Sequence, residues 1–247
     1  MRKYRNRVLA GLGFGFLVVI AILLLSDIRA LAELAVAFPW PVMLLALGLR
    51  AFNWFLRFIK WHYYLGVVGV RDFSQVDSAA LFISGFTLAV SPGKVAELLK
   101  SFVLKNMTGA PVVSTLPVVP AERLSDGVAV LLLAALSVLG LATGQFWPLI
   151  AVSLALIAAG VTVLQVRPLS LWLLERLTEV PMVQRFAAPL RALYESGYAL
   201  CRLKPLAVAV SLGTVANFTD GVGVYLILLA LGLPPSEELF FQALLII

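Results

Sequence analysis

Charged side chains that lie inside apolar segments are the residues of this sequence best able to bind a ligand. Arg50 follows nine apolar residues, and Asn53, Arg57 and Lys60 come after it at spacings of three, four and three. That spacing places all four on one face of an α-helix. An arginine at the centre of a bilayer costs about 2.5–3.5 kcal/mol on insertion scales, so this face needs a partner or water. A basic stripe of this kind favours an anionic ligand such as a lipid phosphate. In the alternative interpretation, Arg50 pairs with an acid, and Arg57 and Lys60 extend to the membrane surface.

A second set of charges lies further along the chain. Glu122 and Asp126 are four residues apart and Arg123 is three residues before Asp126, so the three form one local network if this segment is helical. Lys94, Glu97 and Lys100 share a helical face in the same way. Two interpretations remain open. The charges either lock packed elements together or line a polar groove.

The chain is interrupted between two short apolar runs by residues 91–97, which read Ser-Pro-Gly-Lys-Val-Ala-Glu. The run before this break, residues 79–90, has twelve residues without charge. As a helix it reaches only about 18 Å, against a hydrocarbon core of about 30 Å. Pro and Gly break helices, and irregular backbone at membrane depth survives only beside protein or water. We therefore predict a re-entrant hairpin over residues 79–105 that lines a cavity. The alternative is a plain loop between a surface helix and a spanning one.

These observations define a candidate headgroup-binding groove. Its members are Arg50, Arg57, Ser91, Pro92, Gly93, Lys94, Glu97, Glu122, Arg123 and Asp126.

Composition identifies the environment of these charges. Of the 247 residues, 62% are hydrophobic and 13% are charged, whereas soluble domains carry about 25% charged residues. Together with a mean hydropathy of +1.01, this predicts an all-α integral membrane protein, a polytopic helical bundle formed by one domain. The net charge of +6 suits anionic lipid headgroups better than nucleic acid. Because Cys201 and His62 are the only residues of their types, and no nucleotide signature is present, we expect no metal site, no cofactor and no enzymatic activity.

The order of apolar segments predicts a topology. We expect spans at about residues 8–25, 39–59, 112–141, 146–166 and 206–231, and interfacial amphipathic helices over 168–204. Four positive charges before the first span place the N-terminus in the cytoplasm. A further apolar run begins at residue 239, shortly before the sequence stops, so we expect a truncated protein and a second hairpin there. That hairpin would enter from outside and the first from the cytoplasm, which is the pattern of an inverted repeat.

Three motifs resemble one known family. They are Leu-Arg-Ala-Phe at residues 49–52 with Arg57, the Ser-Pro-Gly-Lys-Val-Ala-Glu break at 91–97, and Ala-Glu-Arg-Leu-Ser-Asp at 121–126. Their order and spacing are similar to those of the flippase-like family, also called the lysylphosphatidylglycerol synthase transmembrane-region family, over the whole chain. In that family the bundle is followed by a second Pro-Gly-Gly hairpin, and some members carry a fused synthase domain that this sequence lacks.

The resemblance implies a multi-pass protein of the bacterial inner membrane that moves a phospholipid or lipid-linked headgroup between leaflets, without transferase activity. Its expected partners are membrane lipids with anionic or lipid-linked headgroups, and we leave open whether copies form a homo-oligomer. Two other functions stay open. One is a non-catalytic membrane subunit that assists a lipid or glycan synthase, and the other is an ion-coupled transporter.

Overall fold

A computed structural model describes residues 13, 15–18, 20, 28–88, 99–142, 144–179 and 184–246. Within these ranges every regular element is a helix, which confirms the predicted all-α class. The elements, in chain order, are α2 (Ile28–Ala37), α3 (Trp40–Val67), α4 (Gln75–Leu88), α5 (Leu99–Thr108), α6 (Val112–Thr115), α7 (Val118–Gly140), η2 (Gly144–Phe146), α8 (Trp147–Gln165), α9 (Arg167–Thr178), α11 (Ala187–Leu200), α12 (Leu203–Ala230) and α13 (Glu237–Ile246).

Four helical segments of the described chain are long and apolar enough to cross a bilayer, so this is a multi-pass membrane protein. They are Trp40–Val67, Val112–Gly140, Gly144–Gln165 and Leu203–Ala230. They lie at the last four of the five expected spans. Most of the first expected span, residues 8–25, is outside the described residues.

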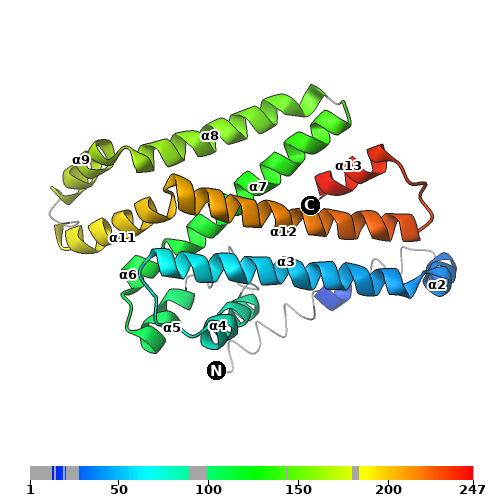
Figure 1. Cartoon of the computed structure of the whole chain (residues 1–247), viewed down its shortest axis with the longest axis horizontal. Helices are drawn as coiled ribbons and strands as arrows, with labels where there is room; N and C mark the ends of the chain where they lie inside the picture. The colour runs from blue at the N-terminus through cyan, green and yellow to red at the C-terminus, as the bar shows by residue number, and fades with distance from the viewer. Residues whose placement is uncertain are drawn as a thin grey trace.

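The long helices α3 and α12 lie side by side and antiparallel along the centre of the molecule (Figure 1). Helix α7 packs across α12, and α8 packs against α7 on the outer side. Small residues allow this close approach. Ala209 and Ala216 of α12 are fully buried, and a Cβ atom built on Gly223 would lie 3.9 Å from the Cβ of Ala46 in α3. Small side chains at crossings are the usual solution for helices in lipid, because packing rather than the hydrophobic effect drives their association.

The largest apolar core lies at the end of the bundle where α3 ends. Trp61, Tyr64 and Leu65 of α3 are buried there against Phe82 of α4 and Leu104 of α5. Because these aromatic residues pack against protein, α3 continues as a helix to Val67, beyond the span end expected near residue 59.

Helices α4 and α5 pack against each other near this end of α3 (Figure 1). They belong to the two limbs of the expected hairpin. The break at residues 91–97 lies outside the described residues, so the re-entrant hairpin stays a prediction. The expected interfacial region 168–204 contains the short helices α9 and α11, which lie at the same end of the bundle.

Helix α13 begins at Glu237, close to the expected start of a second hairpin, and packs against α12 and α7. It follows the far end of α12, whereas α4 lies at the end where α3 finishes (Figure 1). Entry from opposite ends is what an inverted repeat requires. The repeat itself stays a prediction.

Candidate functional site

The basic stripe predicted on residues 50–60 faces α7 and α12. Arg50 pairs with Asp220 of α12, so the acid partner of the alternative interpretation exists. Arg57 and Lys60 both pair with Asp126 of α7. The stripe is therefore engaged within the bundle over its whole length.

Arg57 is the centre of this network, and each of its three guanidinium nitrogens has a partner. Nε donates to Oδ1 of Asn53 at 2.9 Å, Nη1 to Oδ2 of Asp126 at 2.7 Å, and Nη2 to Oδ1 of Asn217 at 3.0 Å. These acceptors come from three different helices, because Asn53 is on α3, Asp126 on α7 and Asn217 on α12. Arg57 thus joins the three central helices.

Asp126 receives a second cation at its other oxygen. Lys60 Nζ donates to Oδ1 of Asp126 and lies 3.4 Å from Oγ of Ser125. The side chain of Lys60 is only 2% exposed, and that of Asp126 is 14% exposed. A buried ammonium persists only when it is paired, and here Asp126 supplies the opposite charge.

Two amides complete the network. Asn53 Nδ2 donates to the carbonyl of Ala216 at 2.6 Å and to Oδ2 of Asp220 at 3.0 Å. Asn217 Nδ2 donates to the carbonyl of Gly213 at 2.9 Å. We call the whole set the polar ladder; its members are Arg50, Asn53, Arg57, Lys60, Asp126, Asn217 and Asp220.

The solvent exposure of the polar ladder decreases along α3 from Arg50 to Lys60. Ten residues separate Arg50 from Lys60, which is about 15 Å along a helix, or about half of a hydrocarbon core. The exposed fraction of the basic side chains falls from 51% at Arg50 to 23% at Arg57 and 2% at Lys60. The ladder is therefore open at Arg50 and closed at Lys60.

A neighbouring charged cluster connects α5 to the bundle. Lys100 is buried, with its Nζ 5.0 Å from the ring centroid of Trp61 and 5.4 Å from that of Phe82. Glu122 of α7 is also buried, and its carboxylate interacts electrostatically with Lys100 and Lys60. Lys100 thus connects α5, one limb of the expected hairpin, to aromatic side chains of α3 and α4 through cation–π contacts.

The structure brings together four of the ten candidate residues: Arg50, Arg57 and Asp126 in the polar ladder, and Glu122 beside it. Arg123 is an exposed residue of α7, and the local network expected of Glu122, Arg123 and Asp126 stays a prediction. The remaining five, Ser91, Pro92, Gly93, Lys94 and Glu97, lie outside the described residues.

Sequence reasoning did not include among the candidates the acceptors on α12 or two members of the stripe, Asn53 and Lys60. Asp220 and Asn217 are three residues apart in an otherwise apolar helix, and this spacing was the available signal. Asn53 and Lys60 were recognised as part of the stripe but were left out of the groove. Both are buried, and each donates a hydrogen bond to a carboxylate of the polar ladder: Asn53 to Asp220 and Lys60 to Asp126.

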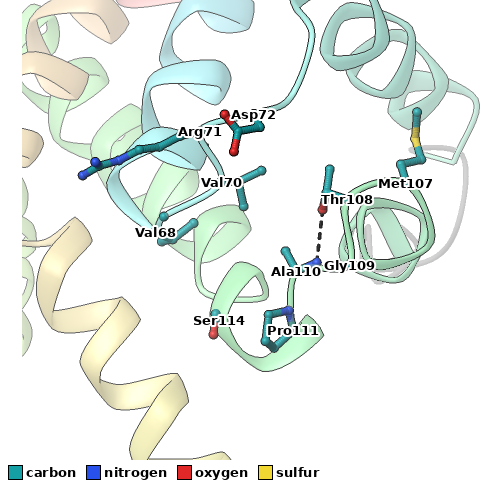
Figure 2. A pocket seen from close by; sticks show the side chains of 11 residues that line it. Val68, Val70, Arg71, Asp72, Met107, Thr108, Gly109, Ala110, Pro111 and Ser114 are labelled. Carbon is teal, nitrogen blue, oxygen red and sulfur yellow. Dashed lines mark hydrogen bonds between the residues drawn. The ribbon is translucent and has the colours of Figure 1, made fainter.

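A separate cavity of about 440 Å³ lies between the loop after α3 and the α5–α6 connection (Figure 2). Val68, Val70 and Pro111 are among the residues that line it. The Arg71 side chain points away from Thr108 and Pro111, so its cation does not face the polar groups on the opposite side of the cavity (Figure 2). We assign it no role in ligand binding.

The fold and the polar ladder define the class of this molecule: a multi-pass helical membrane protein whose charges gather at the crossing of its central helices. The family model described as "Lysylphosphatidylglycerol synthase TM region" matches residues 8–247, so the chain belongs to that family. The resemblance of the three sequence motifs is thereby confirmed. A search of curated proteins found no match, and a search of solved structures found none either.

Proposed function

We propose that this protein is a lipid flippase or scramblase that moves the headgroup of a phospholipid or lipid-linked molecule between the leaflets of the bacterial inner membrane. The observation that carries the proposal is the polar ladder, which provides charged and amide groups over about half of the hydrocarbon thickness. A headgroup crossing the bilayer needs such a path, because charged groups in hydrocarbon are costly without partners. In this proposal the N-terminus is cytoplasmic.

The charge of the region favours an anionic headgroup. Arg50, Arg57, Lys60 and Lys100 are four cations, and Asp126, Asp220 and Glu122 are three carboxylates, which leaves an excess of one positive charge (4 − 3) when all are ionised. An anion that enters the ladder balances this excess. The protein acts without chemical conversion of the lipid, and the driving force is a gradient or mass action.

A reconstitution assay tests the proposal. The full chain is placed in vesicles that contain fluorescently labelled phosphatidylglycerol, and accessibility of the label to an external quencher is followed over time. We expect faster loss of inner-leaflet fluorescence than in empty vesicles, and slower loss for Arg57→Gln. Arg176→Gln is the matched control, because Arg176 is 60% exposed and pairs with Glu179 on its own helix. Rates equal to those of empty vesicles, for every anionic lipid tried, would reject the proposal.

One observation favours a second function, that of a non-catalytic membrane subunit. The members of the ladder satisfy one another's hydrogen bonds across α3, α7 and α12, as expected for residues that lock packed helices together. The triple variant Arg57→Met, Lys60→Met and Asp126→Leu removes Asp126 together with both of its cations, so no buried charge is left without a partner. A lock tolerates this exchange, since buried pairs replaced by apolar residues are often neutral for stability, whereas a headgroup path loses transport.

A further inference from the structure

Asp126 presents its carboxylate to two cations that belong to a single helix. Arg57 approaches Oδ2 at 2.7 Å and Lys60 approaches Oδ1. The two cations are three residues apart on α3, so each oxygen has its own positive partner. The hydroxyl of Ser125 lies beside the Lys60 ammonium at 3.4 Å. This is a preformed cradle for a small, two-oxygen anion.

The neighbouring elements hold the cradle in place and pack closely around its anion. Asn53 and Asn217 fix the guanidinium of Arg57 from two sides. Gly213 of α12 faces the carboxylate, and a Cβ atom there would lie 3.3 Å from Oδ1 of Asp126. The glycine therefore allows α12 to approach this carboxylate more closely than a residue with a side chain would.

We propose that Asp126 occupies the position in which the phosphate of the translocated headgroup binds, and that carboxylate and phosphate compete for Arg57 and Lys60. The inference rests on the proposed function and names the ligand chemistry, a phosphodiester. Like a carboxylate, a phosphodiester shares one negative charge between two terminal oxygens. Arg offers a planar fork and Lys a compact charge, and both are common partners of phosphate.

The competition explains how a site with two cations can release its ligand. A path through the membrane has to bind its cargo strongly enough to admit it and weakly enough to let it leave. Without Asp126, the half-buried Arg57 and the buried Lys60 would hold a phosphate tightly. With Asp126 attached to the next helix, the departing phosphate is replaced at once by an internal anion, so the cations are never left uncompensated.

Binding to the purified full chain tests this, with short-chain dihexanoyl phosphatidylglycerol as the probe. We expect Asp126→Asn to bind the probe at least about tenfold more tightly than the parent protein, which is about 1.4 kcal/mol. The probe should also raise the Tm of Asp126→Asn by at least about 2–4 °C more than it raises that of the parent. Glu195→Gln is the matched control, because Glu195 accepts from Arg167 at the same 2.7 Å but lies on the exposed surface.

Further arms identify the source of the phosphate and locate the site. Dioctanoylglycerol, which has no phosphate, should stabilise neither protein. Stabilisation by inorganic phosphate at the same concentration as the lipid would keep the phosphate site but assign it to a free anion. Combining Arg57→Met and Lys60→Met with Asp126→Asn should abolish the gain.

The outcome separates this inference from the proposed function. Tighter binding by Asp126→Asn without any lipid transport by the parent protein supports the phosphate site and rejects translocation. Unchanged or weaker binding by a folded Asp126→Asn overturns the inference, even if the parent protein transports lipid. If Asp126→Asn does not fold, Lys60→Met is added to it, which leaves Arg57 as the cation without a competitor and gives the same comparison.

Discussion

At the scale of single residues, Asn53 connects the outer and inner parts of the polar ladder. Its side chain is completely buried. Its amide nitrogen donates to Ala216 and Asp220 on α12, and its oxygen accepts from Arg57 on its own helix. Removing this amide leaves its partners, the Ala216 carbonyl, Asp220 and Arg57, without one of their hydrogen bonds in the protein interior. Buried polar groups that lack a hydrogen bond carry the full cost of desolvation.

We therefore expect Asn53→Ala to lower the free energy of unfolding by about 1–3 kcal/mol, the usual cost of stranding a buried polar partner. Unfolding by a denaturing detergent, followed by circular dichroism, measures this. Gln242→Ala is the control, because Gln242 is an exposed amide that donates to Glu238 within α13. Surface changes of that kind stay within about 0.5 kcal/mol. Equal losses for the two variants would contradict a structural role for Asn53.

Residue types and spacing predicted the basic stripe but not its partners. Helical periodicity is local, so the positions of Arg50, Arg57 and Lys60 on one face follow from their separation in sequence. Asp220 lies 170 residues from Arg50, and nothing local says that α12 rather than another span lies opposite. For the same reason the ion pairs of Asp126 with Arg57 and Lys60 of α3 were not predicted.

At the scale of elements, the crossing of α7 and α12 depends on Gly213. A Cβ atom at this position would lie 3.2 Å from the Cβ of Ala129 and 3.3 Å from Oδ1 of Asp126. Both neighbours are on α7, and one of them belongs to the polar ladder. A side chain at residue 213 has to separate the two helices or displace the carboxylate.

We expect Gly213→Val to destabilise the protein by about 1–3 kcal/mol, as overpacking does in a well-packed interior. It should also reduce lipid transport more than stability alone explains, because the substitution reaches Asp126 directly. Gly127→Val is the matched control. Gly127 is a glycine in the interior of α7, and no atom lies within 4 Å of a Cβ built there. The same denaturant and vesicle assays compare the two, and a Gly213→Val protein indistinguishable from Gly127→Val would rule out this close contact.

Helix α3 continues past the predicted end of its span, and the position of the membrane boundary stays a prediction. The span that contains α3 was expected over residues 39–59, and Lys60 and several aromatic residues follow it, a composition that is also typical of a membrane boundary. In the folded chain Lys60 is paired with Asp126, and Trp61 and Tyr64 are buried among other helices. Charge and aromaticity mark a boundary only when the residues face lipid and water, and which side faces protein is decided by tertiary packing.

At the scale of the whole molecule, the alternating directions of the long helices give the bundle two distinct ends. Helix α3 ends, and α12 begins, at the end that holds α9 and α11 (Figure 1). The connection from α12 to α13, residues 231–236, lies at the other end. The excess of basic residues over 167–204 predicts that the α9–α11 end is cytoplasmic.

Cysteine labelling of intact cells tests this orientation. Arg185→Cys introduces an exposed thiol at the α9–α11 end, and Pro235→Cys introduces one at the opposite end. The native Cys201 gives a low background, because it is buried and burial raises the pKa of its thiol, which reduces the reactive thiolate. We expect a membrane-impermeant maleimide to label residue 235 in intact cells, and residue 185 only after the membrane is permeabilised. The protein with Cys201 alone measures the background in both conditions. Labelling of residue 185 in intact cells would reverse the orientation, and labelling of both residues would place the two ends of the bundle on the same side of the membrane.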